Sequence, residues 1–167
     1  GATSALTCKD CAAGKYYDGT GAPSASTCKD CAAGKYYEGT GTSTCTDCAA
    51  GKYSTVTGAT SASTCKDCAA GKYFGVLGIA SPELCFDCAP GRYSVEEGAI
   101  PTATCLPCSE GKYSPHSGAN SSVTCINCEK GKYSTTSAAH SNATCTTCQI
   151  GKYSLDAGMT ACDGCPA

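Results

Sequence analysis

The sequence predicts a small disulfide-rich all-β fold, a linear, solenoid-like rod of nine repeats of about 20 residues with very short strands and no helices. Cysteine supplies 18 of the 167 residues, which exceeds the share of about 8–10% that is typical of a disulfide scaffold. Leucine, isoleucine, valine and phenylalanine together supply only 15 residues, and there is no tryptophan. Because so few large apolar side chains do not build a conventional core, we expect crosslinks to replace it.

A single repeat unit accounts for the whole chain. It reads Gly-Ala, a Ser/Thr-rich stretch, Thr-Cys-x-x-Cys, two residues that are usually small, and Gly-Lys-Tyr. Residues 1-167 form one continuous array, with repeats at 1-20, 21-40, 41-57, 58-77, 78-97, 98-117, 118-137 and 138-157 and a partial repeat at 158-167. The third and ninth repeats lack three residues between the opening glycine and the cysteines, which indicates a surface loop that tolerates deletion.

Two extended segments and one turn are expected in each repeat. The Lys-Tyr segment and the Thr-Cys segment both favour extended chain over about three residues. The Gly-Thr-Gly-Ala sequence at residues 19–22, and its equivalents, favour a turn between them. Frequent glycines and the absence of a 3.6-residue apolar period argue against helices. Each repeat is therefore a small hairpin that depends on its neighbours.

Three arrangements of the Cys-x-x-Cys pairs have to be weighed. A pair closed on itself is typical of redox proteins, where it lies at a helix N-terminus, and no helix is expected here. Zinc fits the spacing of the pairs, but an all-thiolate site uses two pairs, and nine pairs leave one over. The third arrangement joins the second cysteine of one repeat to the first cysteine of the next.

We favour the third arrangement, because crosslinks between repeats stabilise a chain that lacks a core. Each bond would enclose 16 residues, or 13 at the two short loops, and a loop of 16 residues contributes about 3 kcal/mol by restricting the unfolded state. The predicted pairs are Cys11–Cys28, Cys31–Cys45, Cys48–Cys65, Cys68–Cys85, Cys88–Cys105, Cys108–Cys125, Cys128–Cys145 and Cys148–Cys162. Cys8 and Cys165 have no partner in this scheme, so we expect both to be bonded outside this segment, in an array that continues beyond both ends through the same or another chain.

The repeat resembles a known extracellular module. Residues 11–16 read Cys-Ala-Ala-Gly-Lys-Tyr and lead to Thr27-Cys28, and residues 88–94 read Cys-Ala-Pro-Gly-Arg-Tyr-Ser. Both resemble the ephrin-receptor-like cysteine-rich repeat, and they are similar to the first submodule of tumour-necrosis-factor-receptor cysteine-rich domains. The resemblance covers all nine repeats. It implies a cysteine bond across the loop to the next unit, and a secreted or surface location, as in tandem-repeat extracellular proteins of protists and algae.

The repeated tyrosines are the largest apolar surface of the unit. We expect each ring to pack over a disulfide and the small residues of its own turn, with the hydroxyl reaching water or backbone. An aromatic surface for carbohydrate is the functional alternative. The residues are Tyr16, Tyr36, Tyr53, Tyr73, Tyr93, Tyr113, Tyr133 and Tyr153. The lysine before each tyrosine is expected to lay its stem along the ring and its amine in solvent.

Two sequons predict N-glycosylation, at Asn120 and Asn142, both in the Ser/Thr-rich loop. No catalytic group recurs with the repeat: His116 and His140 occur once each, and the aspartate between the paired cysteines gives too few oxygen ligands for calcium. We therefore expect no enzymatic activity, no cofactor and no metal. A net charge of −2 and the lack of a long apolar run favour neither nucleic acid nor membrane insertion.

The predicted function is that of an extracellular structural protein, a disulfide-laddered rod that serves as stalk, spacer or fibril subunit, carries covalent glycans and self-associates into fibrils or longer arrays. A spacer needs many similar copies, and Cys-Lys-Asp-Cys-Ala-Ala-Gly-Lys-Tyr occurs three times in the first four repeats. The alternative is a ligand-binding ectodomain of a cell-surface receptor or adhesin, in which the less regular repeats at 78–137 carry the ligand surface. A zinc-binding array is the third hypothesis.

Overall fold

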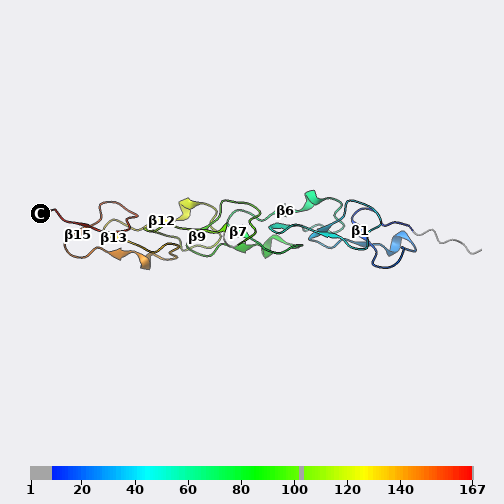
Figure 1. Cartoon of the computed structure of the whole chain (residues 1–167), viewed down its shortest axis with the longest axis horizontal. Coiled ribbons are helices and arrows are strands. Elements are labelled where there is room, and N and C mark those ends of the chain that lie inside the picture. The colour runs from blue at the N-terminus through cyan, green and yellow to red at the C-terminus, as the bar shows by residue number, and fades with distance from the viewer. Residues whose placement is uncertain (1–8, 102–103, 167) are drawn as a thin grey trace, which may run out of the picture. The chain divides into compact units, whose positions relative to one another are not determined.

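The computed structural model describes residues 9–101 and 104–166, and it confirms a small disulfide-rich all-β fold. Every strand is two residues long, and the strands pair into eight separate antiparallel hairpins. Figure 1 shows them as short arrows joined by loops. The hairpins are β1 (Lys15–Tyr16) with β2 (Lys29–Asp30), β3 (Lys35–Tyr36) with β4 (Thr46–Asp47), β5 (Lys52–Tyr53) with β6 (Lys66–Asp67), β7 (Lys72–Tyr73) with β8 (Phe86–Asp87), β9 (Arg92–Tyr93) with β10 (Leu106–Pro107), β11 (Lys112–Tyr113) with β12 (Ile126–Asn127), β13 (Lys132–Tyr133) with β14 (Thr146–Thr147), and β15 (Lys152–Tyr153) with β16 (Asp163–Gly164).

The register of the hairpins follows one rule. The lysine or arginine of Gly-Lys/Arg-Tyr lies opposite the second residue between the paired cysteines of the next repeat, and the tyrosine lies opposite the first. Thus Lys52 lies opposite Asp67, and Tyr53 lies opposite Lys66. The Lys-Tyr strand was predicted. The second strand was expected at Thr-Cys, but it begins at the residue that directly follows the cysteine.

The residue before the cysteine, which is usually threonine, belongs to a short 3-10 helix in the longer loops. In the loop at Ser61, the serine hydroxyl accepts from the Ser63 N–H at 3.2 Å, and the Thr64 hydroxyl donates to the Ser61 carbonyl at 2.8 Å. These bonds hold one tight turn, which the lack of an apolar period did not predict. The 3-10 helices are η1 (Ala25–Thr27), η2 (Ala62–Thr64), η3 (Pro82–Leu84), η5 (Ser122–Thr124) and η6 (Asn142–Thr144). No α-helix occurs in the described ranges, and no helix there is long and apolar enough to cross a lipid bilayer.

The buried residues are small. They are mainly half-cystines, the alanine that follows the opening glycine, and the serine that follows the repeated tyrosine. Ser54 is 1% exposed, and its hydroxyl accepts from the Val56 N–H at 3.3 Å, so its polar atom is satisfied without water. One larger apolar cluster joins Phe74 and Ile79 to the Cys68–Cys85 disulfide. The interior of each unit therefore consists of disulfides and small side chains in place of a conventional core.

The chain divides into two compact units. The first comprises the described residues up to Cys68 together with Phe74–Cys85, and the second comprises Ala69–Tyr73 together with the described residues from Phe86 onward. Each unit contains consecutive repeats with the same hairpins and the same disulfides.

Candidate functional site

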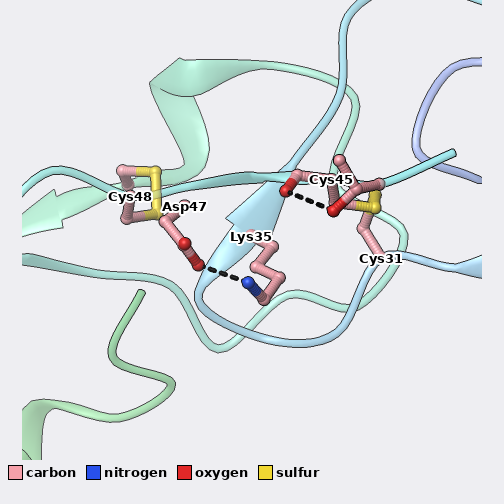
Figure 2. Close-up of polar contacts among 7 residues, drawn as sticks. Cys31, Lys35, Cys45, Asp47 and Cys48 are labelled. Atoms are coloured by element: carbon pink, nitrogen blue, oxygen red, sulfur yellow. Dashed lines mark hydrogen bonds and ion pairs between the residues drawn. A yellow bond between two sulfur atoms is a disulfide. The ribbon is translucent and has the colours of Figure 1, made fainter. Parts of the chain in front are cut away.

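The feature that recurs along the chain is the junction between repeats, so it is the candidate functional element. Eight disulfides join the second cysteine of one repeat to the first cysteine of the next, with Cα–Cα distances between 5.6 and 5.9 Å. Figure 2 shows one of them, Cys31–Cys45, beside the start of the next at Cys48. All eight predicted pairs are confirmed. Cys165 is exposed and unpaired, and Cys8 lies outside the described residues.

Backbone hydrogen bonds tie each repeat to the next one. The Cys31 N–H donates to the Gly14 carbonyl at 2.8 Å, and the Gly14 N–H donates to the Tyr37 carbonyl at 2.9 Å. The same pair of bonds recurs in the second unit, where Cys128 donates to Gly111 and Gly111 donates to Ser134, both at 2.8 Å. Each disulfide is thereby held in a small sheet, and the junction satisfies its own buried backbone groups.

A second set of bonds reaches the repeat after next. The Tyr37 N–H donates to the Ala59 carbonyl at 3.0 Å, and the Gly58 N–H donates to the Cys31 carbonyl at 2.7 Å. In the second unit, the Ser114 N–H donates to the Ala139 carbonyl at 2.9 Å. Isolated parallel bridges such as Tyr36 with Ala59 accompany these bonds. Each junction is therefore built from three successive repeats.

The glycine of Gly-Lys-Tyr allows a close contact between repeats that lie still further apart along the chain. A Cβ added to Gly34 would lie 2.2 Å from the carbonyl oxygen of Gly78, which opens the third repeat along the chain. A Cβ added to Gly111 would lie 2.1 Å from the carbonyl oxygen of Gly158. Since the obstacle is backbone, a side chain here requires the repeats to move apart. At Gly131, whose φ is likewise positive, a Cβ would meet nothing within 4 Å.

The opening glycine carries a second constraint. Gly118 has a φ of +69°, and a Cβ on it would lie 2.7 Å from Oδ1 of Asp87. The equivalent Cβ on Gly158 would lie 2.8 Å from Oδ1 of Asn127. At the eighth repeat this glycine is replaced by Ala138, which keeps a positive φ of 53°. The residue that occupies the aspartate position for that repeat is Pro107, which has no such oxygen. The alanine and the loss of the carboxylate occur together.

The aspartates between the paired cysteines of the early repeats are ion-pair partners. The Lys35 ammonium lies 2.5 Å from the Asp47 carboxylate, and Figure 2 shows the two side chains directed toward each other. The lysine amines of the early repeats are therefore paired, and the lysine side chains remain partly exposed to solvent as expected. The four cross-strand pairs are Lys15–Asp30, Lys35–Asp47, Lys52–Asp67 and Lys72–Asp87. A further pair joins Asp18 to Lys29, and the hydrogen bond from Lys29 lowers the pKa of Asp18 below its ordinary value.

The repeated tyrosines are all half-buried, and each lies in a hairpin. Tyr53 packs against the cluster of Phe74, Ile79 and the Cys68–Cys85 disulfide, so its ring contributes to a later junction. The serine that follows the tyrosine was not predicted as a buried residue, and its exact recurrence after five of the tyrosines is the sequence feature that could have indicated it.

The remaining predicted sites lie on the surface. Asn120 and Asn142 are exposed, and Asn142 begins η6. His116 and His140 are also exposed. Within residues 9–101 and 104–166, no three His, Cys, Asp or Glu side chains gather in an arrangement that would hold a metal ion. A comparison with protein-family models and a search of curated proteins find no match to this chain.

Proposed function

We propose that this chain is an extracellular structural protein, a disulfide-laddered rod that serves as stalk, spacer or fibril subunit. The observation that carries the proposal is the identity of the junctions: the same disulfide, hairpin and backbone bonds recur from repeat to repeat. Because each repeat contacts chiefly its neighbouring repeats, the array suits a structural function that depends on the number of repeats it contains.

The disulfides support the proposed location. Eight crosslinks among the described residues are typical of an oxidising compartment, because cytosolic thiols are kept reduced. We propose that this oxidising compartment is the cell exterior, where the protein is secreted or held at the cell surface. Exposed Asn120 and Asn142 are its N-glycosylation sites, and a glycan on either would lie in the loop outside the disulfide line.

Self-association into fibrils or longer arrays is part of the same proposal. Cys165 is the second cysteine of its repeat. In each of the preceding repeats this cysteine forms a disulfide with the next repeat, whereas the Cys165 thiol is exposed and unpaired. Intact-mass measurement of native protein without reductant tests this bond. A mass above 16.6 kDa that falls on reduction supports it, and a discrete 16.6 kDa species with free thiols contradicts it.

A receptor or adhesin ectodomain is the second candidate, and one observation favours it. In the less regular repeats, the residue opposite the tyrosine is large and apolar: Phe86 is 59% exposed, Leu106 is 46% exposed and Ile126 is 45% exposed. The corresponding residues of the early hairpins are Lys29, Thr46 and Lys66. Exposed apolar surface of this kind is typical of sites that bind a protein partner.

Electron microscopy of native, oxidised protein separates the two candidates. Filaments or long stalks are expected of the structural protein, and reduction should dissolve them. Discrete particles that bind a protein ligand in a saturable manner would overturn the proposal in favour of the ectodomain. Metal analysis with a thiol count addresses the zinc array, because stoichiometric zinc with titratable thiols requires the disulfides to be absent.

A further inference from the structure

The two short loops lack the turn that the longer loops place before the cysteine. The loops closed by Cys31–Cys45 and Cys148–Cys162 have a sequence separation of 14, against 17 in the others. A 3-10 helix ends directly before Cys28, Cys65, Cys85, Cys125 and Cys145 in the longer loops. In the described structure, no 3-10 helix precedes Cys45 or Cys162.

A hollow lies at each short loop, and the two hollows have equivalent walls. The first, of about 150 Å³, is lined by Tyr16, Ala32, Lys35, Thr44 and Cys45. The second, of about 190 Å³, is lined by Tyr133, Gln149, Lys152, Ala161 and Cys162. In repeat positions these are the repeated tyrosine, the residue after the second cysteine, the lysine of the next Gly-Lys-Tyr, the residue before the next cysteine, and that cysteine. The short loop of each unit therefore has a concave site with walls at the same repeat positions.

The two hollows differ in charge. In the first, the Lys35 ammonium is held by Asp47 at 2.5 Å, and Figure 2 shows it directed toward that carboxylate. In the second, Lys152 lies opposite Gly164, which has no side chain. No carboxylate among the described residues lies within ion-pair distance of the Lys152 amine. The second hollow also has the Gln149 amide where the first has the methyl group of Ala32.

We propose that the second hollow binds a single acidic sugar unit, a hexuronate. An unpaired ammonium forms a charge-assisted hydrogen bond with a carboxylate. The Gln149 amide both donates and accepts, which suits sugar hydroxyls, and Tyr133 and Ala161 offer apolar surface to the C–H face of the ring. The hollow is smaller than the range of about 300–1,000 Å³ that is typical of sites for drug-sized ligands, so one sugar ring is the appropriate size. This site goes beyond the structural function and does not depend on it.

The experiment is a titration of the oxidised, ¹⁵N-labelled chain with sodium glucuronate, followed by amide chemical shifts. The expected result is saturable shifts at Gln149, Lys152 and Ala161, with a Kd on the order of 1 mM for so small and open a site. Glucose tests the need for the carboxylate and acetate tests the need for the ring, and each is expected to bind at least tenfold more weakly.

Three variants test the assignment. Lys152→Gln should abolish the shifts, and Gly164→Asp should weaken binding about tenfold, because the new carboxylate pairs with Lys152 as Asp47 pairs with Lys35. Asp47→Asn should create binding at the first hollow by releasing Lys35. All three changes lie at partly or fully exposed side chains or at Gly164, where an added Cβ meets nothing within 4 Å, so the spectrum of the rest of the chain reports intact folding. An absence of saturable shifts, equal binding of glucose or acetate, or binding unchanged in Lys152→Gln would overturn the proposal.

Discussion

The first four hairpins and the last four share one backbone and differ in the charge across their strands. In the first four, an aspartate lies opposite the lysine and forms an ion pair. In the last four, the residues opposite the cation are Pro107, Asn127, Thr147 and Gly164. The bond from the second cysteine to the glycine of the previous repeat is 2.8 Å in the first set, as at Cys68, and 2.8 or 2.9 Å in the second, as at Cys128 and Cys148. The junction is therefore specified by disulfide and backbone, and the ion pair adds little.

The largest expected effect is the loss of a disulfide. Replacing both cysteines of Cys48–Cys65 with serine should destabilise the surrounding repeats by about 2–5 kcal/mol, because the 17-residue separation closes a loop that restricts the unfolded chain. The same change at Cys108–Cys125 should cost the same amount, since the loop is equal and only the ion pair differs. Amide hydrogen exchange of the oxidised variants measures both losses. If removing the disulfide destabilised only one of the two hairpins, the early and late junctions would not depend equally on their disulfides.

The next effect concerns the glycine of Gly-Lys-Tyr. Gly111→Ala and Gly131→Ala both place alanine at a positive φ, which costs about 1–2 kcal/mol. Only at Gly111 does the new methyl group meet the Gly158 carbonyl, which adds about 1–3 kcal/mol of overpacking. Urea unfolding of the matched pair measures the difference. Equal losses would mean that the contact with the third repeat along the chain is not close.

These long contacts also mark where prediction from the sequence ends. The disulfide pairs, the Lys-Tyr strands and the exposed loops follow from spacing and residue type, and the structure has them. The bond from Tyr37 to Ala59 and the close approach of Gly34 to Gly78 do not follow, because near-identical repeats give no indication of which neighbour a repeat contacts. The 3-10 helices were missed because they are held by serine and threonine hydroxyls and have no apolar period. The hollows were missed because a deletion in the sequence predicts only a shorter loop, and because the walls of each hollow come from three different repeats.

A gain of stability is expected at Ala138. This residue has a φ of 53°, where glycine is favoured, so Ala138→Gly should stabilise its repeat by about 0.5–1 kcal/mol after allowing for the greater flexibility of glycine in the unfolded chain. The matched change is Gly118→Ala, which also meets Asp87 and should cost more than Ala138→Gly gains. Thermal unfolding followed by circular dichroism compares them. A destabilising Ala138→Gly would show that the alanine methyl group makes a needed contact.

The smallest effects belong to the ion pairs. Asp67→Asn should cost no more than about 0.5 kcal/mol, because both side chains of the pair are well exposed. The reverse change, Asn127→Asp, places a carboxylate opposite Lys112 and should gain a similar amount. Both effects should disappear in 1 M salt, where the screening length is about 3 Å. A loss of several kcal/mol in Asp67→Asn would mean that the early hairpins depend on charge after all.

Amide hydrogen exchange of the native chain, measured with and without a reductant, tests whether the disulfides are what orders this polypeptide. The account predicts slow exchange at the second cysteine and the opening glycine of successive repeats, including the N–H groups of Cys48, Gly58 and Cys108, which donate along the junctions. On reduction this protection should vanish in every described repeat. If the reduced chain keeps its protected amides, the disulfides are not what orders this polypeptide, and the account is contradicted.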